Sequence, residues 1–347
     1  MTLSIIDPIR DSRYEAFLER QPAASVFHTP GWLEALQRTY GYEPLVFTSS
    51  SSGDQLSDAM PFCKINHWVG GHRMVSLPFS DHCAPLADEP QRLGCLSNML
   101  QEQLAAEGAQ RMEVRVTSSV VPQYNGWHKT STTFVLHELD MAPSIDEIFE
   151  NLHKDCVQRK IHRAEREKLT LEHGVSELLL SKFCSLLLMT RRRHGLPPQP
   201  RSWFRNLLVC LRDKATIRIA SKDGRPVAGI LTLQYKHTLV YKYGCSDEQF
   251  SPLGGIQMLL WQAIQDAKKL KVTMLDMGRS EIENSGLVTF KDRWNATRTN
   301  LTYLQYPRPT TQTIQEAARS LISKRVFACM PDGLRSATGR LLYKYMG

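Results

Sequence analysis

The chain has 347 residues, of which 42% are hydrophobic and 22% charged, and it carries a formal net charge of +8. This length and composition predict a globular protein of two domains, and no run of about 20 apolar residues or basic leader exists to form a transmembrane segment or a secretory signal. Eight scattered cysteines without a C-x-x-C pair argue against a disulfide framework or a zinc site and indicate a reducing, cytoplasmic compartment.

The first half of the chain alternates apolar runs with helical patterns. A Ser-rich loop, 49–57, separates the apolar runs 45–47 and 59–65 and predicts a hairpin. We expect helices at 31–40 and 93–107, and strands at 73–77, 112–116 and 133–139. Ser144, followed by Glu147 three residues later, forms a capping box that starts a new helix.

The second half is easier to interpret. Asp223-Gly224 between two alternating apolar runs predicts a hairpin, and residues 256–270 show an unbroken helical stripe. The expected helices are one beginning at 145, then 177–192, 202–212, 256–270 and 288–294. The expected strands are 169–173, 215–220, 226–235, 238–243, 272–276 and 299–306.

This order of elements resembles the GNAT acyltransferase fold, and the first half looks like a shorter copy of the same plan. Each half has a helix that begins with a hydroxyl residue before a proline, at Thr29-Pro30 and Ser251-Pro252. We therefore predict an α/β protein with a mixed (α+β) sheet and tandem GNAT-like domains. The N-terminal domain is expected at 1–142, the C-terminal acyltransferase domain at 143–306, and a basic amphipathic helical tail at 307–347.

The GNAT resemblance implies a donor site at the start of the helix after the fourth strand. Free backbone N–H groups there can hold a diphosphate, and we expect Gly254 and Gly255 to bind the donor. The usual loop is Gln/Arg-x-x-Gly-x-Gly/Ala, but this chain has Pro252 in place of the first Gly, which removes one N–H donor. The alternative is that both glycines serve helix–sheet packing.

Several segments resemble motifs of the Fem-type peptidoglycan-bridge aminoacyltransferases and their relatives in exopolysaccharide systems. These segments are 27–32 (FHTPGW), 83–88 (CAPLAD), 159–167 (RKIHRAERE), 243–246 (YGCS), 275–280 (LDMGRS) and 286–294 (GLVTFKDRW). The resemblance implies twin GNAT-like domains and acyl transfer to an amine. It implies no permanently bound cofactor, with acyl-CoA or aminoacyl-tRNA as co-substrate. The family's long coiled-coil arm is missing from the sequence, which weakens the tRNA alternative.

The resemblance also suggests catalytic residues. Lys291 matches a lysine placed to stabilise the tetrahedral oxyanion of acyl transfer, a role in which a fixed cation lowers the barrier; the alternative is a surface lysine beside Phe290. Asp88 matches the family's motif aspartate, and Asp81 lies on the other side of the same segment. A carboxylate there can accept a proton from the attacking amine, or simply serve a turn. No metal-binding pattern is present.

Substrate-binding residues are expected in the same motifs. Arg279 follows a strand end, where its guanidinium can bind phosphate or carboxylate, or pair with a nearby acid. The matched motifs imply that Ser280, Tyr243 and Trp32 contact the substrate.

Arginines recur with helical spacing. Arg163 belongs to a stripe with Arg159 and Arg166, and Arg193, which matches a family position implicated in phosphate binding, extends it if the two helices are neighbours. Together with the net charge, this favours an anionic, phosphorylated envelope precursor as partner, although a solvated face is the alternative. Nucleic acid is expected only if the donor is a tRNA. The basic tail can pack on the protein or contact the inner membrane surface.

The sequence thus predicts an enzyme, an acyltransferase that moves an activated acyl group onto an amine of a cell-envelope sugar or peptide precursor. The alternative is a non-catalytic binding protein of GNAT fold in polysaccharide biosynthesis or export.

Overall fold

The computed structural model describes residues 3–66, 72–107, 111–117, 126–130, 132–307 and 343–344. These residues form two compact units. Unit 1 contains the described residues up to 134, with 300–307 and 343–344, and unit 2 contains residues 135–299. The division does not follow chain order throughout, because residues 300–307, which come after unit 2 in the chain, belong to unit 1.

Unit 1 begins with two helices and builds a mixed sheet. Its elements are β1 (Ser4–Ile6), α1 (Ser12–Arg20), η1 (Val26–His28), α2 (Pro30–Tyr40), β2 (Glu43–Thr48), β3 (Asp58–Asn66), β4 (His72–Ser76), β5 (Leu86–Ala87), α3 (Pro90–Glu107), β6 (Arg111–Thr117) and β7 (His128–Lys129). Strands β1 to β4 are antiparallel neighbours, β4 pairs with β6 in parallel, and β6 pairs with β14 (Thr297–Tyr306). The Ser-rich loop does join a hairpin, as predicted.

Unit 2 repeats this plan with longer elements. They are β8 (Phe134–Asp140), α4 (Ile145–Asn151), the π-turn η3 (Lys154–Gln158), α5 (Arg159–Arg166), β9 (Thr170–Gly174), α6 (Glu177–Arg193), α7 (Arg201–Leu211), η4 (Arg212–Lys214), β10 (Ala215–Lys222), β11 (Arg225–Tyr235), β12 (Thr238–Ser246), η5 (Glu248–Leu253), α8 (Gly255–Lys269), β13 (Met274–Glu281) and α9 (Ser285–Asp292). Strands β9 to β12 are antiparallel, β13 joins β12 in parallel, and β8 follows β13.

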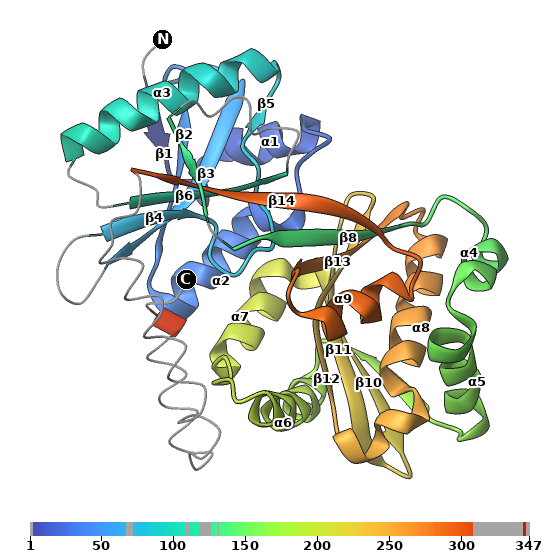
Figure 1. The fold of residues 1–347 in the computed structure, drawn as a ribbon. Helices are drawn as coiled ribbons and strands as arrows, with labels where there is room; N and C mark the ends of the chain where they lie inside the picture. The colour runs from blue at the N-terminus through green and yellow to red at the C-terminus, as the bar shows by residue number, and fades with distance from the viewer. Residues whose placement is uncertain are drawn as a thin grey trace. The chain divides into compact units, whose positions relative to one another are not determined.

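Two helical layers cover opposite faces of the unit 2 sheet. A Cβ placed on Gly229 of β11 would meet Phe183 of α6, whereas the neighbouring Ala228 faces Gly255 at the start of α8. Adjacent strand residues point to opposite faces, so α6 packs on one face and α8 on the other. Helix α5 packs on α8, and Figure 1 shows α5 and α8 on one side of β10–β12 with α6 and α7 on the other.

The repeated plan confirms the predicted tandem GNAT-like architecture. In each unit four antiparallel strands lead into a helix, α3 or α8, and then into a fifth, parallel strand. The sixth strand is exchanged, because β8 of the first half borders β13 and β14 of the second half borders β6.

Three expected elements differ in detail. The helix capped by Ser144 ends at Asn151, and a π-turn then starts a separate helix, α5, at Arg159. Ser251 and Pro252 lie in the 3-10 turn η5, and α8 begins only after the left-handed Gly254. Strand β13 continues to Glu281, so the glycine and arginine of the LDMGRS segment lie inside it.

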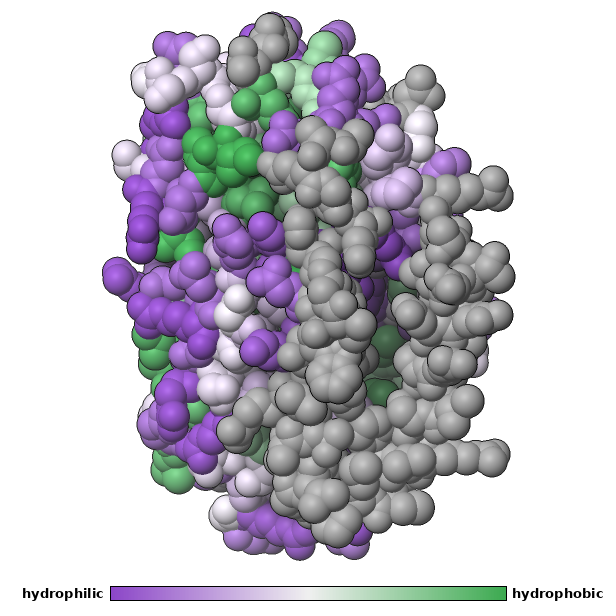
Figure 2. Space-filling model, turned by 90° about the vertical axis from the view of Figure 1, so that its left-hand side faces the viewer, coloured by the Kyte–Doolittle hydropathy of each residue, from purple (hydrophilic) through white to green (hydrophobic). Residues whose placement is uncertain are grey.

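The exposed surface carries few large apolar side chains. Figure 2 shows hydrophobic residues in separate groups among hydrophilic ones on one face. Within the residues that the structure describes, no helix is long and apolar enough to cross a bilayer. Apart from 307 and 343–344, the predicted basic tail lies outside the described residues.

Candidate active site

The unit 2 sheet opens between β12 and β13. Strand β12 pairs with β11 along its whole length, but it pairs with β13 only from Thr238 to Val240, opposite Met274 to Asp276. Beyond Val240 and Asp276, β12 and β13 are not paired with each other in the part of the chain that the structure describes. The strands part where the GNAT-like plan predicts the donor site.

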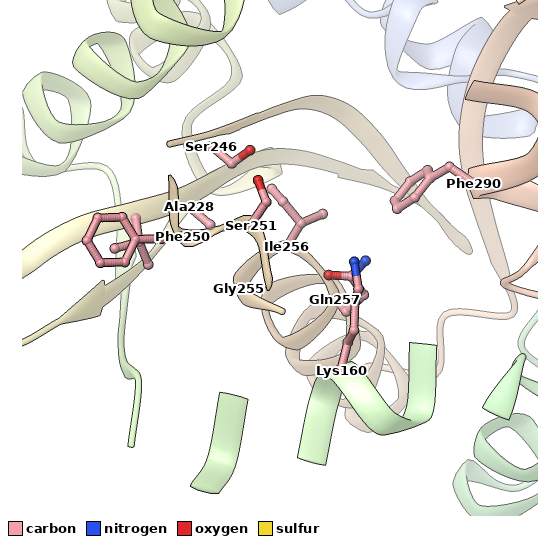
Figure 3. A pocket seen from close by; sticks show the side chains of 10 residues that line it. Lys160, Ala228, Ser246, Phe250, Ser251, Gly255, Ile256, Gln257 and Phe290 are labelled. Carbon is pink, nitrogen blue, oxygen red and sulfur yellow. The ribbon is translucent and has the colours of Figure 1, made fainter. Parts of the chain in front are cut away.

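A pocket of about 180 Å³ lies beside the last residue of β12, Ser246, which lines it (Figure 3). In Figure 3 the rings of Phe250 and Phe290 stand on opposite sides of the pocket. The lining comes from α5, β11, β12, η5, α8 and α9, through Lys160, Val227, Ala228, Ser246, Phe250, Ser251, Gly255, Ile256, Gln257 and Phe290.

Unused hydrogen-bonding groups face this pocket. Gln257 is 8% exposed and lines it, and its amide makes no hydrogen bond with any described residue. The N–H groups of Gly255 and Ile256 belong to the first turn of α8, which has no intrahelical acceptor, and no other described acceptor pairs with them. These groups are therefore available to hydrogen-bond a ligand in the pocket.

Gly254 and Gly255 were predicted to bind the acyl donor. Close packing is sufficient to explain why glycine occupies both positions, without a bound ligand. Gly254 has φ +81°, and a Cβ there would lie 2.2 Å from the carbonyl oxygen of Lys160 in α5. At Gly255 a Cβ would lie 2.8 Å from the Cβ of Ala228. Helix α5 therefore covers one side of the loop that was expected to hold a diphosphate.

Lys291 is a buried cation that hydrogen-bonds to the backbone of β13. It is 3% exposed, and its ammonium donates to the carbonyl oxygens of Gly278 at 2.7 Å and Arg279 at 2.9 Å. Gly278 has φ +72°, and its N–H donates to Asp276 at 2.6 Å. Lys291 thus places a positive charge at the strand end and fixes the turn in it.

A buried histidine lies close to this cation. His137 of β8 is fully buried, and its Nε2 lies 3.4 Å from a carboxylate oxygen of Asp292 without hydrogen-bond geometry. Burial, and then the charge of Lys291, lower the pKa of His137. The carboxylate of Asp292 accepts from Arg298, which lowers the pKa of Asp292.

The predicted substrate residues of unit 2 have distinct settings. Ser280 is 1% exposed, and its hydroxyl has no partner among the described residues, whereas Arg279 is half-buried. The phenol oxygen of Tyr243 accepts from Gln199 at 3.0 Å and from Trp203 at 2.9 Å. Helix α7 and the loop before it therefore hold Tyr243 on the α6 face of the sheet.

The two arginine groups do not form one stripe. Arg163 is exposed on α5, which packs on the α8 face, and Arg193 is exposed at the end of α6 on the opposite face. The condition under which Arg193 would extend the stripe, that the two helices are neighbours, is not met, because the sheet separates them.

Three predicted residues belong to unit 1. Trp32 is fully buried and packs edge-on against Phe27 at 4.9 Å, as a core side chain. Asp88 is exposed at the end of β5, where its carboxylate accepts from Gln21. Asp81 is half-buried, and its backbone carbonyl accepts from Tyr303 at 2.7 Å.

Gln257 and His137 of the unit 2 site were not predicted from the sequence, although the sequence contains an indication of each. Gln257 interrupts the apolar face of α8 three residues before Leu260 and seven before Ile264. His137 stands between Val135 and Leu139 on one face of a predicted strand. A polar residue in an apolar stripe marks a group that needs a partner inside the protein.

Solved structures share this architecture. FemX superposes with a TM-score of 0.70 and 13% identity, over 90% of this chain and 99% of FemX. A C-terminal domain from Agrobacterium fabrum, named as belonging to a lysylphosphatidylglycerol synthetase, gives a TM-score of 0.57 and 14% identity, over 90% and 94% of the two chains. A tandem GNAT protein from the clavulanic acid biosynthesis pathway gives 0.55 and 9%, over 89% and 99%.

Because these sequence identities are low, the three structural similarities are evidence for the fold alone. No curated protein sequence matches the chain. Residues 153–292 match the family model of the acetyltransferase (GNAT) domain, and this segment contains the parted strands, the pocket and Lys291. The chain therefore contains a GNAT-type acyltransferase domain and is an acyltransferase.

Proposed function

We propose that this enzyme moves an acyl group from a pantetheine thioester to an amino group of an anionic cell-envelope precursor. The parting of β12 from β13 beside the pocket is the observation that carries the proposal. A pantetheine arm is extended and carries two amide groups. Beyond Val240, β12 is no longer paired with β13, so an extended arm with two amides can lie along this part of β12 as a neighbouring strand would.

The pocket lining supports the same donor. Val227, Ile256 and the two phenylalanine rings offer apolar contacts to the methylene groups of the arm, and Gln257 offers an amide. Small-molecule sites are usually pockets that combine apolar side chains with a few polar groups, and this pocket has both.

The chemistry follows from the charge at the end of β13. The amine nitrogen attacks the thioester carbonyl, and a tetrahedral oxyanion forms. Lys291 supplies positive potential in a buried setting, where such a charge acts more strongly than in water.

The acceptor is proposed to bind on the α6 face. Arg193 closes α6 together with Arg191 and Arg192, and Tyr243 lies on the same face. Arginine forks suit phosphate oxygens, so these residues favour a phosphorylated acceptor. The fold likeness to FemX and to a domain named for lysylphosphatidylglycerol supports an acceptor in the cell envelope.

The test measures free thiol released from acetyl-pantetheine in the presence of amino sugars, amino-sugar phosphates and amino-acid amides. We expect thiol release that depends on the amine and saturates with its concentration. Aminoacylated tRNA is assayed in parallel through deacylation. Amine-dependent deacylation of the tRNA with no thiol release would overturn the thioester donor.

A further inference from the structure

We infer that the acyl thioester reaches this pocket on the phosphopantetheine arm of an acidic carrier protein rather than on free coenzyme A. The inference rests on the proposed function and names the molecule that delivers the donor. Three features of α5 and the pocket carry it.

The first feature is the closed side of the diphosphate loop. The carbonyl oxygen of Lys160 approaches Gly254 so closely that even a Cβ would collide with it. A carbonyl oxygen carries partial negative charge and repels a phosphate. Pro252 has already removed one N–H donor from the same loop. This loop is therefore poorly suited to the diphosphate of coenzyme A.

The second feature is the size of the pocket. Its volume is about 180 Å³, whereas sites for drug-sized ligands usually measure about 300–1,000 Å³. The space suits the end of an arm, and whatever carries the arm would lie outside the pocket. Gln257, more than nine-tenths buried and without a described partner, lies in this space.

The third feature is the charge around the pocket mouth. Helix α5 has the sequence RKIHRAER, with four cations and one carboxylate, and its Lys160 lines the pocket. Arg159 and Arg163 make only loose ion pairs, at 3.3 Å with Asp155 and 3.9 Å with Glu167, and their side chains are 71% and 45% exposed. Exposed pairs of this kind contribute little, so their charges remain available to a partner.

An acidic protein fits this surface best. Complementary charge steers a partner to its docking site and fixes its orientation, and α5 would place the arm of such a partner at the pocket mouth. The end of a tRNA is also anionic, but its nucleobases, ribose and phosphate do not form an extended arm with amide groups that could lie along β12 as a strand would. The guanidinium of Arg225 lies 4.9 Å from the ring centre of Phe250. One face of this pocket-lining ring is therefore already occupied and is not open to a tRNA base.

The step balances without a further reactant. The amine forms a C–N bond to the acyl carbon as the C–S bond breaks. The amine loses one proton, and the departing thiolate takes one up. The products are the N-acylated acceptor and the carrier protein with a free thiol on its arm.

The experiment measures binding of three probes by fluorescence anisotropy and competition. They are a purified bacterial acyl carrier protein in its acetylated holo form, the same protein without its arm, and acetyl-CoA. We expect the acetylated holo carrier to bind at least about tenfold more tightly than either other probe. Reversing two charges with Arg163→Glu and Arg166→Glu should weaken carrier binding at least tenfold while leaving acetyl-pantetheine binding unchanged.

The matched control reverses Lys269 and Lys271, exposed cations at the far end of α8, and should leave carrier binding unchanged. Acetyl-CoA binding as tightly as the carrier, no effect of the α5 reversal, or tighter binding of aminoacylated tRNA would each overturn the inference. These results leave the proposed function standing if acetyl-pantetheine still releases thiol to amines. Failure of acetyl-pantetheine itself would remove the proposed function and this inference together.

Discussion

At position 291 the chain buries an ammonium group and satisfies it with two backbone carbonyls of β13. Lys291→Met keeps the length of the side chain but removes the charge and both hydrogen bonds. Hydrogen bonds to charged groups contribute about 1.5–3 kcal/mol each, so the unfolding free energy should fall by about 3 kcal/mol. Loss of an oxyanion partner should lower turnover by about 10²–10³-fold.

Denaturant unfolding and thiol release measure these two effects separately. Lys291→Arg, which keeps the charge, should retain more stability than Lys291→Met, and Lys269→Met at an exposed site should change neither quantity. Near-normal turnover in Lys291→Met would remove this lysine from the mechanism.

His137 should make stability depend on pH. Burial and Lys291 lower its pKa in the folded state, whereas the unfolded value is about 6.5. Below that pH the unfolded chain binds a proton that the folded chain does not, so stability falls as pH decreases. His137→Gln should flatten this fall between pH 7.5 and 5.5 in urea unfolding curves. The control is His162→Gln, at an exposed site; an equal slope in wild type and His137→Gln would contradict the assignment.

The sequence predicted several residues of the site but not their surroundings. The motif around Lys291 indicated a cation that could stabilise an oxyanion, yet nothing in the sequence indicated that two carbonyls bind the ammonium or that His137 lies nearby. Gly278 and Arg279 lie only 13 and 12 positions before Lys291, whereas His137 lies more than a hundred positions before it. Both contacts depend on how α9 and β8 pack beside β13 rather than on local pattern. Trp32 matched a motif but lies in the core, because its large ring fills the space beside Phe27.

At the scale of elements, the contact between α5 and the start of α8 can be tested at a glycine. Gly254→Ala combines an unfavourable φ of +81° with a collision against a backbone carbonyl, so it should destabilise the protein by at least about 2 kcal/mol. Gly286 in α9 has open space around its Cβ position. Gly286→Ala should therefore be neutral or stabilise by up to about 1 kcal/mol. Equal unfolding midpoints for the two variants would contradict the packing described here.

The periodic pattern predicted most helices and strands, but not which helices are neighbours. Arg163 and Arg193 both lie on basic helices, and amphipathic spacing alone did not reveal that a sheet separates them. Successive residues of a strand point to opposite faces of the sheet. Here Ala228 of β11 contacts α8 and the next residue, Gly229, contacts α6, so the two helices lie on opposite faces. The same geometry separates the proposed donor surface on α5 from the proposed acceptor surface on α6.

At the scale of the whole chain, the order of elements was sufficient to predict tandem GNAT-like units. It was not sufficient to predict the exchange of their last strands, because a strand's sequence does not state which of two similar sheet edges it joins. Strand β14 was expected to close the second domain, yet it pairs with β6 of unit 1 from Leu301 to Tyr306.

Hydrogen–deuterium exchange with and without acetyl-pantetheine tests the central claim most directly, because it locates the donor on the chain. We predict slower exchange of the backbone N–H groups in residues 241–246 of β12 and at the start of α8, with little change in β9 and β10. Wild type and Gln257→Leu should differ at the start of α8. Protection confined to unit 1, or no protection at an acetyl-pantetheine concentration that supports thiol release, would contradict a donor site between the parted strands.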